Sequence, residues 1–237
     1  MSGNPASYAL SIDWANAGSF PDNGDSAKLR SFSIKRGRDQ TFSGDPATGE
    51  ARLARDQVGT LSLTLDNEDG RYDSYNTSSP ISPNVTPGHT VRLQVTDDAA
   101  NTYTLFTGAV DDIRSQSYRH DARVTITCSD AWKKMSQRPI ASSITSWSTS
   151  PSVSPTLYYP VVEILGYAGV TTGTNADTGY TFDAGSDGYY ITFTNNDVPY
   201  QTIHDLCEMD GGYCWIGFDD KFYFLQRTNA IADTSNF

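Results

Sequence analysis

The sequence predicts a mainly β protein with a minor helical part, in which a β-barrel or sandwich precedes a smaller α+β region. Asp supplies nearly all of the 28 acidic residues. Because Asp favours turns and Glu favours helix surfaces, this imbalance indicates a chain with many turns. The 14 Tyr and 10 Phe residues, together with frequent Thr and Val, favour strands. Regular alternation at Leu61, Leu63 and Leu65 indicates a strand with one buried face.

The first 140 residues carry the predicted strands of the barrel or sandwich. The second strand has Leu29, Phe32 and Ile34 at uneven spacing, which indicates a β-bulge. Strands that recur about every ten residues with turns between them are typical of these folds. The strands are expected at 8–14, 29–35, 58–65, 90–96, 102–113 and 121–128, the loops at 19–26 and 39–50, and hairpin turns at 97–101 and 115–121.

A smaller region follows a junction rich in Ser, Thr and Pro. Before the junction, Ser129 and Asp130 are predicted to cap a short helix that carries Trp132 and Met135 and ends before Pro139. Beyond it, apolar residues at helical spacing predict two further helices. These helices are expected at 160–170 and from Asp197 to Gly211 and Gly212, a strand at 189–194, and a hairpin at 213–218 and 221–227. The predicted organisation is a barrel domain at 1–140, the junction at 141–158 and an α+β region at 159–237.

The composition argues against several classes of function. With 17 basic and 28 acidic residues, the net charge is −11, which disfavours tight binding to a nucleic-acid backbone. The first residues lack the basic and apolar parts of a secretory signal, and no apolar run approaches the roughly 20 residues of a membrane helix. Three cysteines, Cys128, Cys207 and Cys214, are too few for a disulfide framework. We therefore expect assembly in the cytoplasm and no membrane partner.

The acidic segment from Asp66 to Asp73 invites comparison with a calcium-binding loop. An EF-hand loop requires an oxygen ligand at position 1, Gly at position 6 and Glu at position 12. With Gly70 at position 6, those two ligand positions fall on Leu65 and Asn76, so the segment fits a solvated turn better.

No other motif supports a metal, a cofactor or catalysis. His89, His120 and His204 are scattered without metal-ligand spacing, and Cys207 and Cys214 fit small buried apolar residues. The chain lacks a nucleophile elbow, a phosphate-binding loop and a dinucleotide fingerprint. The adjacent carboxylates Asp111 and Asp112, like Asp219 and Asp220, fit charged hairpin ends better than a glycosidase pair. We therefore predict no cofactor, no metal site and no enzymatic activity.

Four phrases in a fixed order carry a family resemblance. They are Lys-Arg-Gly-Arg at 35–38, Leu-Asp-Asn-x-Asp-Gly-Arg-Tyr-Asp at 65–73, Ser-Pro-Asn-x-x-Pro-Gly at 82–88 and Thr-Gly-x-Val-Asp at 107–111. In this order and spacing the phrases resemble the N-terminal part of phage minor tail proteins, the tail-tip hub family that is related to baseplate hubs. The resemblance covers 8–132 and resumes more faintly at 160–227. The residues expected to form its structural turns are Lys35, Arg36, Gly37, Arg38, Asp66, Asn67, Asp69, Gly70, Arg71, Pro83, Pro87, Gly88, Thr107 and Gly108.

The resemblance implies a tail-tube-like barrel and a structural function in a virion. The implied function is a hub ring that closes the tail tube, anchors tip and fibre proteins for host attachment, and gates the DNA channel. Implied partners are further copies of the chain, the tail tube or distal tail protein, the tape measure protein and tip or fibre proteins, with transient passage of DNA. Hubs of this family resemble homotrimers with two barrels per subunit. The resemblance therefore favours a trimer, but this sequence shows one barrel. That departure leaves two alternatives open, a fragment of a longer hub and a chain that forms a sixfold ring, a hexamer, by itself. The implied location is the tail tip of a virion assembled in the host cytoplasm.

Aromatic residues in the second half are candidate partner contacts, because exposed Tyr and Trp bind sugars and proteins efficiently. One alternative interpretation is therefore a β-sandwich carbohydrate-binding module for attachment to the host surface. A second alternative is a peptidoglycan-cleaving enzyme of the tail tip. The aromatic candidates are Trp147, Tyr158, Tyr159, Tyr189 and Tyr190, and the competing interpretation is that part of each pair faces the core.

Overall fold

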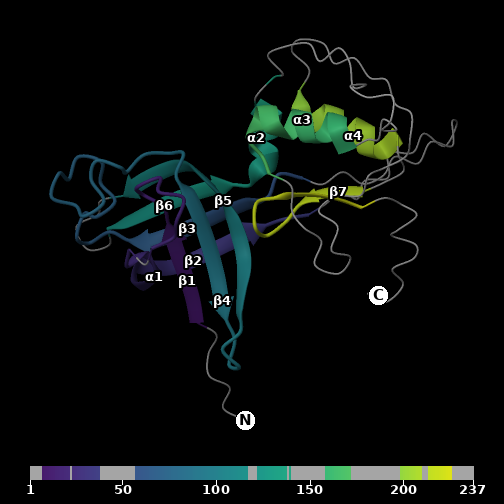
Figure 1. Cartoon of the computed structure of the whole chain (residues 1–237). Coiled ribbons are helices and arrows are strands. Elements are labelled where there is room, and N and C mark those ends of the chain that lie inside the picture. Colours follow the sequence, from purple (N-terminus) through teal and green to yellow (C-terminus); the bar gives the residue numbers. More distant parts are fainter. Residues whose placement is uncertain are drawn as a thin grey trace, which may run out of the picture. The chain divides into compact units, whose positions relative to one another are not determined.

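The computed structural model describes residues 7–21, 23–37, 57–116, 122–137, 139, 158–171, 198–209 and 213–225. The chain forms two compact units. We name the barrel unit for Met1–Arg36, Val58–Asp130 and Phe218–Asp220, and the helical unit for Gly37–Gln57, Ala131–Gly217 and Lys221–Phe237. The mainly β fold class predicted from the sequence is confirmed, because a curled antiparallel half-barrel sheet is accompanied by a small α+β region (Figure 1).

The barrel unit consists of one antiparallel sheet with the strand order β1-β4-β5-β6-β3-β2. Alternating apolar residues of these strands pack into one buried hydrophobic core. Leu61, Leu63 and Leu65 are all buried, as their period-two spacing predicts. The strands are β1 (Ser7–Ile12), β2 (Leu29–Lys35), β3 (Thr60–Asp66), β4 (Thr90–Thr96), β5 (Thr102–Gln116) and β6 (Arg123–Ser129).

Most predicted strands are confirmed, with differences at their ends. The bulge predicted in the second strand lies between Leu29 and Ser31. The first strand ends at Ile12, two residues early, because the Asp13 carboxylate turns the chain by accepting hydrogen bonds from the amides of Ala17 and Gly18. The strand β5 continues through Gln116 into the predicted turn, whose remaining residues lie outside the described part of the chain.

The sequence-based prediction of a loop at 19–26 is wrong at its end, where the short helix α1 (Asp25–Lys28) begins. Four residues are too few for a helical period, and Gly24 precedes the helix in a left-handed conformation without a side-chain cap. Helix α1 covers the free edge of β1. The Ser26 hydroxyl donates to the Leu10 carbonyl at 3.0 Å and accepts from the Leu10 amide at 2.9 Å. The Ser26 side chain thereby satisfies the backbone amide and carbonyl groups of Leu10, which another strand could otherwise bind at this edge.

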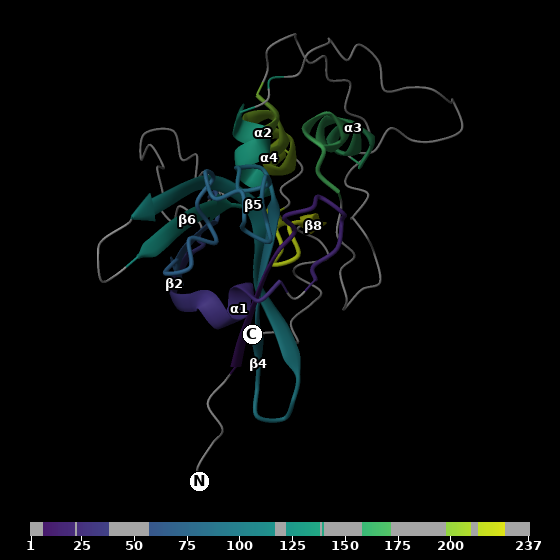
Figure 2. The ribbon, with the colours of Figure 1, turned by 90° about the vertical axis from the view of Figure 1, so that its left-hand side faces the viewer.

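Two bulges bend the long strand β5 against its neighbours. One lies between Leu93 and Gln94 in the pairing with β4, and the other lies between Val110 and Asp112 in the pairing with β6. Near the second bulge, a Cβ atom on Gly108 would lie 2.3 Å from the Ser129 carbonyl oxygen, so this close approach requires glycine. Figure 2 shows the hairpin of β4 and β5 extending beyond α1 at the lower end of the view.

The helical unit contains α2 (Ala131–Gln137), α3 (Tyr158–Ala168), α4 (Pro199–Met209), β7 (Tyr213–Ile216) and β8 (Phe222–Leu225). Trp132 is fully buried at its centre, stacked on His204 with 4.7 Å between ring centroids. The predicted helices and hairpin are therefore present. However, α3 begins two residues early and ends at Ala168, because the following Gly169 has a φ of 69°. The predicted strand at 189–194, the helix-capping positions Asp197, Gly211 and Gly212, and the Ser/Thr/Pro-rich junction up to 157 lie outside the described residues.

Candidate interaction surface

The acidic segment after β3 folds around the side chain of Asn67. This side chain is buried, and its oxygen accepts the Tyr72 amide at 2.9 Å. Its amide group donates to Asp73 Oδ1 at 3.1 Å and to Ser115 Oγ at 3.2 Å. Asn67 therefore joins the loop to strand β5, and Asn fits this position because it supplies both an acceptor and donors.

The carboxylates of the same segment organise its backbone. Asp66 accepts the Glu68 amide at 2.9 Å and Asp69 accepts the Arg71 amide at 3.2 Å, two Asx turns that Asp favours. Gly70 has a φ of 65°, which suits a residue without a Cβ atom.

Cations from the end of α1 and the start of β2 compensate this acidic turn. Lys28 lies 2.9 Å from Asp69, and Arg30 lies 2.8 Å from Asp66. The hydrogen bond from the Glu68 amide, followed by that from Arg30, lowers the pKa of Asp66 below its ordinary value of 3.8. These ion pairs are exposed, so their contribution to stability is small.

A buried carboxylate ties the acidic turn to the N-terminal part of the barrel unit. Asp25 is fully buried and accepts hydrogen bonds from the Tyr72 hydroxyl at 2.8 Å and from Trp14 Nε1 at 3.1 Å. Arg71 Nε lies 3.6 Å from the same carboxylate, and its guanidinium also donates to the Asn23 carbonyl. Burial raises the pKa of Asp25 above 3.8, although its hydrogen bonds and Arg71 oppose the rise. We name Asp25, Trp14, Tyr72 and Arg71 the Asp25 anchor.

The loop that follows, up to β4, is held at both ends. The Ser79 hydroxyl donates to the Arg71 carbonyl at 2.6 Å, and the Gly88 amide donates to the Val110 carbonyl at 2.8 Å. At the end of the loop, buried His89 has its Nδ1 atom 3.0 Å from the Asp13 carbonyl oxygen. Pro83 and Pro87, with Gly88, lie exposed on this loop, and Pro83 follows a cis peptide bond.

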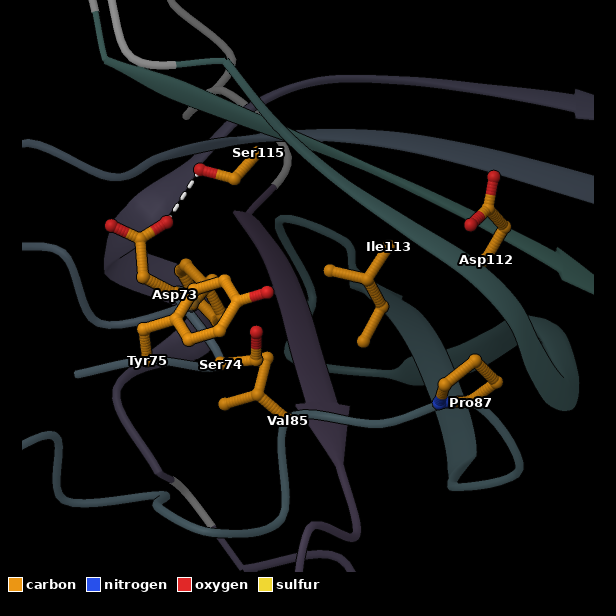
Figure 3. A pocket seen from close by; sticks show the side chains of 9 residues that line it. Asp73, Ser74, Tyr75, Val85, Pro87, Asp112, Ile113 and Ser115 are labelled. Atoms are coloured by element: carbon orange, nitrogen blue, oxygen red, sulfur yellow. Dashed lines mark hydrogen bonds between the residues drawn. The ribbon is translucent and has the colours of Figure 1, made fainter. Parts of the chain in front are cut away.

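A pocket of about 340 Å³ lies between this loop and strand β5. Figure 3 shows Asp73 and Tyr75 at one end, with Ser115 bonded to Asp73, and Ile113 and Pro87 farther along. The side chain of Tyr75 is 96% exposed, whereas Tyr72 is buried beneath. The pocket is lined by residues 72–75, by Val85 and Pro87 from the loop, and by Asp112, Ile113 and Ser115 from β5.

The remaining signature residues lie toward the opposite end of the sheet. Along the pairing of neighbouring strands, Ser115 lies opposite Val124. Val124 lies opposite Leu65, and Leu65 lies opposite Leu29. In the same way, Lys35 is aligned with Thr60, Ser129 and Ala109, next to Thr107 and Gly108. Lys35 is exposed, Arg36 lies with its guanidinium 5.2 Å from the Phe106 ring centroid, Gly37 follows β2, and Arg38 lies outside the described residues. The structure therefore brings together the second and third phrases of the signature. The third phrase also meets the fourth, where the Gly88 amide donates to the Val110 carbonyl, and the first phrase lies at the far end of the sheet.

The aromatic candidates are only partly placed. Tyr158 and Tyr159 begin α3, but nothing is described of their side chains. Trp147, Tyr189 and Tyr190 lie outside the described residues. Sequence reasoning missed the exposed aromatic residues of the barrel unit, which among the described residues are Tyr75, Phe218 at 57%, Tyr103 at 54% and Tyr8 at 46% exposure. It also missed Asp25, although the neighbouring Gly24 and the acidic residue itself were visible turn signals.

The described residues show neither a cluster of His, Cys, Asp and Glu suited to a metal ion nor a helix long and apolar enough to cross a bilayer. Cys128, Cys207 and Cys214 are buried free thiols. Burial, with a smaller contribution from Asp111, raises the pKa of Cys128 far above its ordinary value, which leaves this thiol unreactive at neutral pH.

No protein-family model and no curated protein matches the chain. Solved structures are similar to it, among them two tail proteins. The 43 kDa tail protein of prophage MuSo2 from Shewanella oneidensis has a TM-score of 0.52 at 13% identity, over 93% of this chain and 53% of that chain. The tail protein from Neisseria meningitidis MC58 has a TM-score of 0.50 at 7% identity, over 92% of this chain and 51% of that chain. This chain thus spans about half the length of either protein, and at such identities the similarity is one of fold.

Proposed function

We propose that this chain is a structural component of a phage or phage-like tail tip, where it forms a hub ring that closes the tail tube. The observation that carries the proposal is the fold of the chain, which two tail proteins share over more than nine-tenths of its length. The four sequence phrases support the same family independently of the fold, and two of them build the loop surface described above.

The proposed ring is homo-oligomeric, a trimer in preference to a hexamer. Exposed aromatic residues on the hairpin end of the sheet support a contact between subunits there. Tyr8 is paired with Val95, and Val95 is paired with Tyr103, so these three side chains lie on the core-facing side of the sheet, beyond the buried Leu10 and Leu93 at its hairpin end. Tyr8 and Tyr103 are half-exposed, and such residues are enriched in protein interfaces. We assign the exposed rings at this hairpin end to the contact with the neighbouring subunit.

The charge of the chain suits a channel through which DNA passes. A net charge of −11 repels phosphates, so an inner wall built by this chain would let DNA slide without binding it. Around the ring, the proposed partners are the tail tube or distal tail protein, the tape measure protein, and the tip or fibre proteins that the hub anchors. The same account proposes a non-enzymatic role in host attachment.

Light scattering over a range of protein concentrations, with negative-stain microscopy of the same sample, tests the ring. We expect a mass three or six times the 25.9 kDa of the chain and a ring with a central hole. Tyr103→Ser should shift the assembly toward monomer, whereas the matched control Tyr75→Ser should not. A monomer at every concentration, or equal effects of the two variants, would contradict a ring formed through this hairpin end.

A further inference from the structure

The pocket beside β5 contains an acidic group that lacks a positively charged neighbour. Across the described residues, most carboxylates around this loop surface lie within an ion pair, whereas Asp73 forms none. Its hydrogen bonds come from the neutral groups of Asn67 and Ser115, and both reach Oδ1. The carboxylates that do have a cationic partner are Asp25, Asp66, Glu68, Asp69 and Asp112.

The second carboxylate oxygen of Asp73 remains available to a ligand. A carboxylate can accept about four hydrogen bonds in total. Gly70 lies beside this oxygen, since a Cβ atom built there would be in ordinary van der Waals contact with Oδ2 at 3.4 Å. The loop thus holds the carboxylate in place through Oδ1 and leaves Oδ2 without a partner among the described residues.

The walls of the pocket suit a long side chain with a cationic end. Val85, Pro87 and Ile113 supply apolar surface, and the exposed ring of Tyr75 lies near Asp73 in Figure 3. A volume of about 340 Å³ is at the lower end of the range of about 300–1,000 Å³ for ligand pockets, so the pocket accommodates a single side chain with its flanking backbone. An arginine meets these features best, because its stem covers apolar surface while its planar head binds a carboxylate and stacks on an aromatic ring.

We propose that this pocket binds an arginine side chain presented by a basic segment of a partner protein, with Asp73 as the anion and Tyr75 as the stacking surface. Charge complementarity selects the partner. A second copy of this chain would bring another net charge of −11, whereas a basic segment is attracted by the field of the whole chain. The proposal rests on the geometry of the pocket and does not depend on the tail-tip function.

The direct test is a titration of the ¹⁵N-labelled protein with N-acetyl-arginine amide, followed by amide chemical shifts. The matched ligand N-acetyl-citrulline amide has nearly the same shape without the charge. We expect saturable shifts at the loop and at Ile113 and Ser115 with the arginine probe, and at least tenfold weaker binding of citrulline. A more basic peptide with one central arginine should bind more tightly and lose that gain at high salt.

Two variants separate the anion from the aromatic surface. Asp73→Asn keeps an acceptor for Asn67 and Ser115 and should weaken arginine binding about tenfold. Tyr75→Ala changes a side chain that is almost fully exposed, so it should leave the fold intact and weaken binding about three- to fivefold. The control Asp98→Asn removes the same charge at the exposed tip of the β4–β5 hairpin and should leave binding unchanged.

Several results would overturn the proposal. They are equal binding of arginine and citrulline, shifts that map away from the pocket, or equal effects of Asp73→Asn and Asp98→Asn. Should Asp73→Asn fail to fold, two measurements still test the proposal. They are the comparison of arginine with citrulline on the unaltered protein and the binding of arginine to Tyr75→Ala. Concentration-dependent self-association that Tyr75→Ala abolishes would instead assign the pocket to a second copy of the chain and refute a basic partner.

Discussion

The Asp25 anchor should contribute substantially to the stability of the barrel unit, and Asp25→Ala tests this. The substitution removes the acceptor of the Tyr72 hydroxyl and of Trp14 Nε1, and it leaves the Arg71 guanidinium without its carboxylate. A buried donor without a partner costs about 1–3 kcal/mol, and removal of one partner of a buried ion pair costs about 3–5 kcal/mol. Because these costs overlap, we expect the free energy of unfolding to fall by about 3–5 kcal/mol.

Urea denaturation at neutral pH, followed by far-UV circular dichroism, measures this change. Asp25→Asn retains one acceptor oxygen and should cost less than Asp25→Ala. The exposed control Asp98→Asn should change stability by no more than about 0.5 kcal/mol. A double-mutant cycle with Tyr72→Phe should give a coupling energy of about 0.5–3 kcal/mol, because the two side chains share a hydrogen bond.

The pH dependence of the same variant has a definite sign. Folding raises the pKa of Asp25 above 3.8, so the folded protein binds this proton more tightly than the unfolded chain does. The contribution of this titration to stability is therefore fully present below 3.8 and decreases as the pH rises through the folded-state pKa. The cost of Asp25→Ala should decrease over that window. A cost under about 1 kcal/mol at all pH values, or one that increases with pH across it, would refute the reasoning.

Three further predictions concern the barrel unit. Gly108→Ala should lower the free energy of unfolding by about 1–3 kcal/mol in urea, because its Cβ atom would overlap the backbone of β6; a change within about 0.5 kcal/mol would contradict the close approach. Ser26→Ala should cost about 1–3 kcal/mol by leaving two edge groups of β1 unpaired, whereas the exposed control Ser33→Ala should cost little. Arg30→Ala should raise the pKa of Asp66 in an NMR titration only part of the way to 3.8, because the Glu68 amide still binds the carboxylate. Folding lowers this pKa, so the ionised Asp66 contributes to stability above pH 3.8, and the contribution is lost as the pH falls through the folded-state pKa. The Arg30→Ala variant should therefore lose less stability over this acidic range.

The strands of the barrel could be predicted because their signal is local. Leu61, Leu63 and Leu65 alternate with Ser62 and Thr64, and this pattern alone determines which face is buried. The bulge near Leu29 was likewise visible as a break in the alternation. Strand ends were less predictable, because side-chain contacts such as those of Asp13 decide where a strand stops.

The interaction surface could not be derived from the sequence, because its parts come together only in the folded sheet. The pocket joins Asp73 and Tyr75 to Ile113 and Ser115, which are about forty positions away in the sequence. The acidic phrase predicted a turn, but nothing in it shows that Asn67 bonds to β5 or that Asp73 alone lacks a cation. Helix α1 was missed for a related reason, since its four residues are positioned by contacts of Asp25 and Ser26 with distant segments.

The location of the protein in a particle tests the central claim most directly. Gold labelling of an epitope-tagged copy of this chain, in purified phage or phage-like particles viewed by negative stain, measures that location. The account predicts label at the tail end distal to the head, in all tailed particles. Label confined to the head or spread along the tube, or particles with intact tail tips that lack the protein, would contradict a tail-tip hub.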